Sequence, residues 1–121
     1  MRTCTGKPAE LGGIPHELGT TGYGVTSALE AAIEVLEELR SLHISKNQIR
    51  VSIQGFGNVS SFTAKFLDSS GIKVVAISDV SGFIYNKDGL NIPRLMKDIK
   101  GKTKFSYLKI ISYFAYSSHL L

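Results

Sequence analysis

The sequence has few of the residues that mark disulfide-stabilised, metal-bound or membrane-spanning proteins. Its 121 residues include one cysteine, three prolines and no tryptophan. With Cys4 alone, the chain forms neither an intramolecular disulfide nor a multi-cysteine metal site, and a reducing compartment is favoured. No apolar run approaches the ~20 residues of a transmembrane helix, and the first residues lack the apolar core of a secretion signal. We therefore expect a soluble, cytoplasmic protein that makes no membrane contact.

The distribution of charge and of histidine excludes two further classes of site. The net charge of +4 comes mainly from a basic cluster late in the chain: Arg94, Lys97, Lys100, Lys102, Lys104 and Lys109. No aromatic-basic repeat or recognition-helix motif accompanies this cluster, so we do not expect nucleic-acid binding. His16, His43 and His119 share no metal-ligand spacing, so we expect no metal site.

Length and composition favour one folded domain. With 43% hydrophobic and 20% charged residues the chain resembles soluble globular proteins, which argues against disorder. Residues 1–20 are rich in glycine and proline and predict a linker or hinge without regular structure. From Val25 onward, apolar residues recur at helical spacing as far as Leu39, and Thr20 or Thr21 is placed to cap this helix.

The central part of the sequence predicts a strand, a helix and a second strand. Ile49, Val51 and Ile53 alternate as in a short strand that stops at Gly55. The apolar positions Val59, Phe62, Phe66 and Leu67 then fit one face of a helix, with Gly71 as its left-handed cap. Residues 72–77 are β-branched and apolar, as expected for a strand covered on both faces. Together these segments predict a βαβ unit with a helix before it, the opening part of a doubly wound parallel α/β sheet.

The residues after this unit predict a small hairpin and a short helix. Residues 83–85 form an extended piece, followed by a strong turn signal at residues 86–89. Asn91 is a plausible N-cap and Pro93 fits the first turn of a helix that Gly101 would end.

The glycine-containing segment between the first strand and its helix predicts a phosphate site. A phosphate must come within hydrogen-bonding distance of backbone N–H groups at a helix start, and side chains would obstruct that approach. Gly55 permits the tight turn, and Gly57 allows the phosphate to approach the backbone closely. Ser60 stands where the dinucleotide-binding fingerprint has a third glycine or alanine, and it is small enough to substitute. The helix N-terminus adds a partial positive charge.

Asp79 stands about 20 residues beyond the glycines, at the end of the second predicted strand. A carboxylate in this place accepts hydrogen bonds from the adenosine ribose hydroxyls, which makes it a candidate cofactor residue. The alternative is an aspartate that only starts the turn at residues 81–82, where this residue type is common.

Several motifs resemble glutamate dehydrogenases of the glutamate/leucine/phenylalanine/valine dehydrogenase family in order and spacing. They are Thr5-Gly6-Lys7-Pro8, Gly12-Gly13, Thr21-Gly22-Tyr23-Gly24-Val25, Gln54-Gly55-Phe56-Gly57-Asn58-Val59, and Ser78-Asp79 with the run from Ile84 to Leu90. The resemblance covers about residues 5–100. It implies a Rossmann domain that binds NAD, with NADP as the alternative, for oxidative deamination of glutamate to 2-oxoglutarate and ammonia. The cofactor residues expected on these grounds are Thr21, Gly55, Phe56, Gly57, Asn58, Val59 and Asp79.

Two of these residues owe their assigned roles to the resemblance. It implies that Thr21 lies near the nicotinamide and Asn58 near the phosphate and ribose, although both are equally suited to start helices. Family members commonly carry arginine where this chain has Glu17, and some also do at Tyr23, so a charge that could face a carboxylate substrate is lost or reversed.

The resemblance also leads us to expect an incomplete catalytic unit. The family's catalytic lysines and aspartate lie in a substrate domain before the Thr5 motif, where this sequence has only four residues. We therefore assign no catalytic residue and expect the chain alone to have no activity. It would be divided into a linker (1–20), a partial cofactor domain (21–104) and an atypical tail (105–121), which is either a third strand or the product of a reading-frame shift. The alternative function is a non-catalytic remnant or an interaction module that self-associates or pairs with a related subunit.

Overall fold

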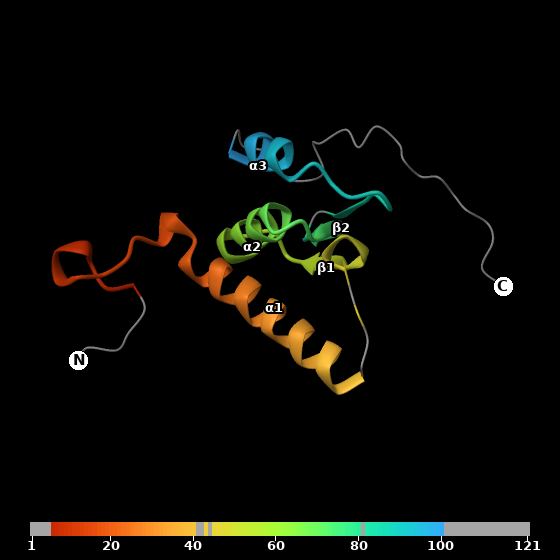
Figure 1. The fold of residues 1–121 in the computed structure, drawn as a ribbon. Helices are drawn as coiled ribbons and strands as arrows, with labels where there is room; N and C mark the ends of the chain where they lie inside the picture. Colours follow the sequence, from red (N-terminus) through yellow and green to blue (C-terminus); the bar gives the residue numbers. More distant parts are fainter. Residues whose placement is uncertain (1–5, 41–42, 44, 81, 101–121) are drawn as a thin grey trace.

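A computed structural model describes residues 6–40, 43, 45–80 and 82–100. Its helices α1, α2 and α3 lie side by side in the order α1-α2-α3, and the strands lie next to them (Figure 1). The core contains side chains of all three helices and of the sheet; its most completely buried members are Ala64, Leu67, Ile72, Ile77 and Ile92. These helices therefore pack on the same face of the sheet.

The segment before α1 contains more regular structure than the sequence predicts. Two short 3-10 helices, η1 (Ala9–Leu11) and η2 (His16–Leu18), lie where a linker without regular structure is expected. Each ends at a glycine in the left-handed conformation, Gly12 with φ 75° and Gly19 with φ 71°. The glycines that predicted a loop thus act as the ends of single helical turns.

Helix α1 (Thr20–Arg40) begins five residues before Val25, where the predicted apolar pattern starts. Because the helix begins at Thr20, the prediction that Thr20 or Thr21 precedes and caps it is wrong. Gly22 and Gly24, which look like helix breakers, lie inside the first two turns. At Gly22, the packing of α1 against α2 overrides the low helix propensity of glycine.

An ion pair joins α1 to the segment before the sheet. Lys46, in η3 (Lys46–Gln48), lies 2.7 Å from Glu30 in α1, measured from Nζ to Oε1. This hydrogen bond and a second one from Ser70 hold the pKa of the Glu30 carboxyl below its ordinary value. Strand β1 (Arg50–Gln54) follows, as the sequence predicts.

The βαβ unit is confirmed. Helix α2 (Asn58–Ser69) connects β1 to β2 (Lys73–Asp79), and the two strands pair in parallel, with Gln54 beside Ser78 at their carboxyl ends. Gly71 has φ 80°, and the N–H of Ile72 donates to the carbonyl of Leu67 at 2.9 Å. Gly71 therefore ends α2 as a left-handed cap, as predicted.

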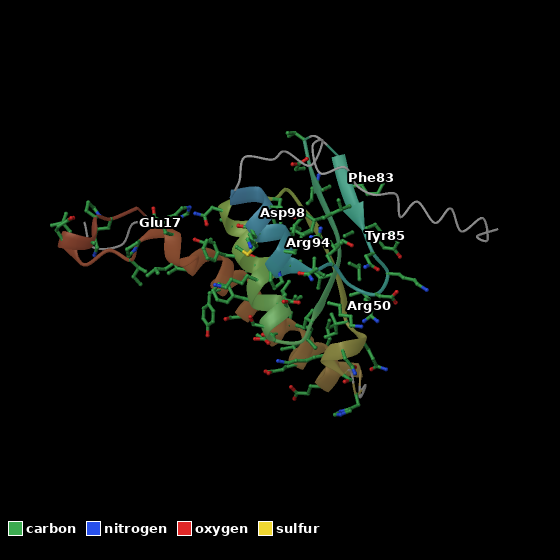
Figure 2. The ribbon with its side chains drawn as sticks, turned by 90° about the horizontal axis from the view of Figure 1, so that it is seen from above. Glu17, Arg50, Phe83, Tyr85, Arg94 and Asp98 are labelled. Carbon is green, nitrogen blue, oxygen red and sulfur yellow. The ribbon has the colours of Figure 1, made fainter. Side chains whose placement is uncertain are left out.

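The third strand corrects the expected sheet topology. Strand β3 (Gly82–Tyr85) pairs antiparallel with β2, so the sheet is mixed, in the order β1-β2-β3, rather than wholly parallel. The short turn between β2 and β3 reverses the chain directly, whereas a parallel partner would need a crossover connection. Within the described residues the sheet carries helices on one face only. Phe83 and Tyr85 lie on the opposite side of β3 and are exposed (Figure 2).

The last described helix, α3 (Ile92–Lys100), begins as predicted. The side-chain Oδ1 of Asn91 accepts a hydrogen bond from the N–H of Arg94 at 3.0 Å, so Asn91 is its N-cap. Ile92 and Leu95 join the core from this helix. The predicted end at Gly101 and the predictions for residues 105–121 fall outside the described residues.

Candidate functional site

The glycine loop, residues 55–57, joins the end of β1 to the start of α2. Gly55 has φ 83°, a left-handed conformation that glycine adopts without strain. Its N–H donates to the carbonyl of Ser78 in β2 at 2.7 Å. The loop is therefore fixed at the carboxyl edge of the parallel pair, where ligands of open α/β sheets bind.

Glycine is needed at position 55 because the backbone there is left-handed. At position 57, neither the backbone conformation nor the packing of the described residues requires glycine. Its φ of −87° and ψ of −162° are accessible to other residues. A Cβ built on Gly57 would meet no heavy atom within 4 Å. Space is thus open in front of the backbone at the start of α2, as a closely approaching ligand needs.

The first turn of α2 suits an anion. The N–H groups at a helix start have no partners within the helix, and the helix dipole places partial positive charge there. No acidic residue occupies this turn. The N-cap, Gly57, makes no side-chain hydrogen bond to these N–H groups. The arrangement fits the phosphate of a dinucleotide without the help of a lysine.

Asn58 is the first residue of α2 and not its cap. Its side-chain Nδ2 donates to the carbonyl oxygen of His16 in η2 at 3.5 Å. Its own carbonyl accepts a hydrogen bond from the Ser61 hydroxyl at 3.0 Å. The alternative that Asn58 starts a helix is therefore confirmed, and its side chain links the segment before α1 to the glycine loop.

Phe56 in the loop and two residues of the first turn of α2 differ in their exposure to solvent. Phe56 is half-buried and packs against the hydrophobic core, so it anchors the loop. Val59 is exposed in the first turn of α2, and its carbonyl accepts a hydrogen bond from Thr63. Ser60, the small residue expected to let helix and strand approach, is half-buried.

Asp79 lies at the end of β2, at the same edge of the sheet as the glycine loop. Its Oδ1 accepts a hydrogen bond from the N–H of Gly82 at 3.1 Å. The turn role considered for this residue is thus confirmed. The role as a ribose acceptor stays a prediction, and the two are compatible because a carboxylate has several acceptor positions.

The resemblance-derived residues before α2 are spread along the start of the chain. Thr21 is exposed in the first turn of α1, next to α2. Glu17 lies in η2, on the segment that extends away from the sheet (Figure 2).

Sequence reasoning missed a contact between α1 and α2 that lies just behind this site. Thr26 and Thr63 are buried, and both hydroxyls donate toward the carbonyl oxygen of Gly22, at 3.1 and 3.4 Å. The available signal was the spacing of Gly19, Gly22 and Thr26, which places small side chains on one helical face.

Other features of the described residues do not add to the site. A cavity of about 450 Å³ lies between α3 and the C-terminal half of α2, away from the glycine loop; Lys65, Asp68 and Met96 are among its lining residues. The described part of the chain contains no cluster of three or more histidine, cysteine, aspartate or glutamate side chains that could hold a metal ion. In the same residues no helix is long and apolar enough to cross a membrane.

Comparison with protein-family models shows a family that the chain matches. Residues 12–118 match the model of the glutamate/leucine/phenylalanine/valine dehydrogenases. The chain is 43% identical over 97 residues to an NADP-specific glutamate dehydrogenase of Saccharolobus shibatae, covering 79% of this chain and 21% of that protein. It is 45% identical over 92 residues to a catabolic NAD-specific glutamate dehydrogenase of Bacillus subtilis, covering 76% of this chain and 20% of that protein. The chain thus spans about a fifth of the length of these curated relatives.

Solved structures give a similar result. The fold matches a glutamate dehydrogenase from Peptoniphilus asaccharolyticus with a TM-score of 0.65 and 28% identity, over 84% of this chain and 25% of that one. It matches a hetero-hexameric glutamate dehydrogenase from Thermus thermophilus, in a leucine-bound form, with a TM-score of 0.57 and 28% identity, over 81% of this chain and 22% of that one.

Proposed function

This chain belongs to the glutamate/leucine/phenylalanine/valine dehydrogenase family, and we propose that its glycine loop binds the pyrophosphate of NAD or NADP. The observation that carries the proposal is the open space at Gly57. Neither backbone strain nor contact with the described protein atoms calls for glycine there. A phosphate that must approach the backbone N–H groups of α2 does call for it.

Asp79 supports the same proposal from the neighbouring strand. The hydrogen bond from Gly55 to Ser78 keeps the glycine loop and the end of β2 together. A dinucleotide whose pyrophosphate lies on the loop places its adenosine ribose toward the end of the second strand in Rossmann domains. We propose that the Asp79 carboxylate accepts hydrogen bonds from that ribose, and that the described elements are part of a doubly wound sheet of this kind.

We propose that NAD is the preferred form of the cofactor. The similarity to relatives does not decide this, since an NADP-specific and an NAD-specific enzyme resemble the chain almost equally. The argument rests on charge, because the Asp79 carboxylate repels the 2′-phosphate of NADP and the next residue, Val80, offers no positive charge to hold it.

For the reaction, we propose that the chain supplies the cofactor-binding part of a glutamate dehydrogenase. Its curated relatives bear that name. Oxidative deamination requires the glutamate α-carbon held against the nicotinamide and a group that moves a proton. We assign neither task to a residue of this chain, and we expect no turnover of glutamate by the purified chain alone.

Calorimetric titration of the full chain with NAD tests the binding proposal. We expect saturable binding by the wild type and at least a tenfold loss in Gly57→Val, since the added side chain fills the space in front of the N–H groups. Valine at a helix N-cap also costs about 1 kcal/mol of stability. Asn91→Ala is the matched control, because it removes the cap of α3 at a similar cost and lies away from the loop. No binding by the wild type, or equal loss in both variants, would refute the proposal.

A second candidate function is association with another subunit. The observation that favours it is the exposure of Phe83 and Tyr85, 58% and 55% exposed, on the sheet face without helices. Exposed apolar groups of this kind mark contact surfaces. One structural relative is described as hetero-hexameric. Sedimentation of the wild type and of Phe83→Ser with Tyr85→Ser distinguishes the cases, since a contact through this face predicts a shift toward monomer in the double variant.

A further inference from the structure

Helices α1 and α2 approach each other closely at Gly22. A Cβ built on Gly22 would lie 2.7 Å from the Phe62 Cβ, 2.7 Å from the backbone nitrogen of Thr63 and 2.8 Å from the carbonyl oxygen of Val59. Two of these three atoms belong to the backbone of α2, so a side-chain rotation does not relieve the clash. Gly24, one of the neighbouring glycines of α1, would meet nothing within 4 Å. Glycine is thus required at Gly22 by its neighbour helix.

The same position receives buried hydrogen bonds. Thr26 and Thr63 are 3% and 7% exposed, and their hydroxyl groups point toward the carbonyl oxygen of Gly22 from α1 and from α2. The single hydroxyl proton of Thr63 is shared with the carbonyl of Val59 in its own helix, which is the nearer acceptor at 2.9 Å. The polar contact between the helices favours one relative position, because a shift breaks the contact of the Thr63 hydroxyl with Gly22 and leaves only its bond to Val59.

The contact fixes two helix starts relative to each other. Asn58 contacts His16, just before α1, while Val59 and Thr63 contact Gly22 in its first turns. The N-terminal ends of α1 and α2 therefore lie side by side. In Figure 1, α1 lies on the opposite side of α2 from α3. The N–H of Leu90, in the segment that leads to α3, donates a hydrogen bond to the carbonyl of Val74 in β2. The start of α1 thus lies on the side of α2 that faces away from α3, whereas β2, which ends at Asp79, lies on the side toward α3.

We propose that Gly22 is a positioning residue that sets the distance between the first turn of α1 and the glycine loop, so that a dinucleotide is held by both. This inference rests on the proposed function. With the pyrophosphate on the loop and one nucleoside directed toward Asp79, the other nucleoside extends toward the start of α1. A mononucleotide such as ADP needs only the loop and the end of β2.

A side chain added at position 22 should therefore weaken the binding of NAD and leave the binding of ADP nearly unchanged. Moving α1 outward removes contacts to the second nucleoside and leaves the loop, which is fixed by Gly55 and Ser78, in place. In Gly22→Ala we expect NAD affinity to fall about tenfold, the loss of roughly one hydrogen bond. The affinity for ADP should stay within about twofold. A residue that only stabilised the fold would weaken both ligands equally.

Calorimetric titration of the full chain with NAD and with ADP tests the inference, with Gly24→Ala as the matched glycine control. We expect Gly24→Ala to bind both ligands like the wild type. Unchanged NAD affinity in Gly22→Ala, or equal losses for NAD and ADP, overturns the positioning role and leaves the proposed function intact. A wild type that binds neither ligand overturns both.

Thr63→Val gives a second test, which adds no volume where α1 contacts α2. It removes the buried hydroxyl at nearly constant size, and we expect a smaller loss, about threefold, confined to NAD. Thr63→Ser should restore the affinity, since it keeps the hydroxyl. The control is Ser27→Ala, which removes a hydroxyl from an exposed position of α1. A Thr63→Val chain with wild-type affinity for NAD contradicts the inference even if Gly22→Ala does not fold.

Discussion

The N–H of Gly55 donates a hydrogen bond of 2.7 Å to the carbonyl oxygen of Ser78, which joins the turn after β1 directly to the residue before Asp79. Two candidate features that lie far apart in the sequence, the glycine loop and the acidic end of β2, are thus held at one edge of the sheet. The same bond depends on the left-handed backbone of Gly55, with φ 83°.

Gly55→Ala tests this dependence. An alanine Cβ is strained in the left-handed region, so we expect a net loss of about 1 kcal/mol in the free energy of unfolding. Gly24→Ala should change stability in the opposite direction. Replacing an exposed glycine inside a helix with alanine raises the free energy of unfolding by roughly 0.5–1 kcal/mol. Urea unfolding of both variants and the wild type measures the difference, and equal stability in the two variants would show that the turn geometry at Gly55 matters little.

Asp79→Asn tests the cofactor preference. Asparagine keeps an oxygen for the N–H of Gly82 and removes the charge that repels a 2′-phosphate. We expect the ratio of NAD to NADP affinity to fall about tenfold, equivalent to about 1.4 kcal/mol. Competitive titration with both nucleotides measures the ratio. Asp88→Asn, in the exposed turn after β3, is the control. A wild type that prefers NADP would contradict the proposed role of the charge.

The ion pair between Glu30 and Lys46 predicts a specific dependence of stability on pH. The pKa of Glu30 is lowered in the folded state by its hydrogen bonds to Lys46 and Ser70, from an ordinary value of 4.5. A lowered carboxyl pKa stabilises the folded state above the unfolded-state pKa, and the contribution is lost as pH falls through the folded-state value.

We therefore expect Glu30→Gln to lower the melting temperature slightly near pH 7, and the difference from the wild type to disappear in acid below pH 4.5. The effect should be small because the pair is exposed and screened by salt. Glu34→Gln, an exposed position on the same helix, is the control. A difference between Glu30→Gln and the wild type that grows on acidification would have the wrong sign for this mechanism.

The segment after α3 is expected to promote self-association. From Ile110 onward the sequence has no charged group apart from His119, and it is rich in aromatic and β-branched residues, a combination typical of strands that aggregate. Light scattering of the full chain and of a version ending at Gly101 measures the effect. We expect the full chain to be the larger species; a monomeric full chain beside an aggregating shorter version would mean that residues 105–121 complete the fold.

The sequence predicts the parts of this fold that depend on local chemistry. Alternation in residues 49–53 and the β-branched run at residues 72–77 locate both parallel strands. Asn91 and Gly71 are identified correctly as helix caps, because a side-chain oxygen and a left-handed backbone are local requirements.

What escaped prediction depends on contacts between distant segments. Thr20 and Thr21 are predicted as caps before the helix, whereas both lie inside α1. No local pattern shows that Gly22 is packed against α2. The link from Asn58 to His16 spans 42 residues, which no local pattern reveals. Among the candidate site residues, the glycines of the loop and Asp79 follow from spacing, whereas the buried threonines behind them do not.

Amide chemical-shift mapping by NMR tests the central claim most directly, because it reports where NAD binds on the chain. In a titration of the isotope-labelled full chain, we expect the largest shifts at residues 55–60 and at Asp79, with residues of the cavity between α2 and α3, such as Ser69 and Met96, unchanged. No perturbation at saturating NAD, or shifts confined to that cavity, would contradict the assignment of the glycine loop as a dinucleotide site.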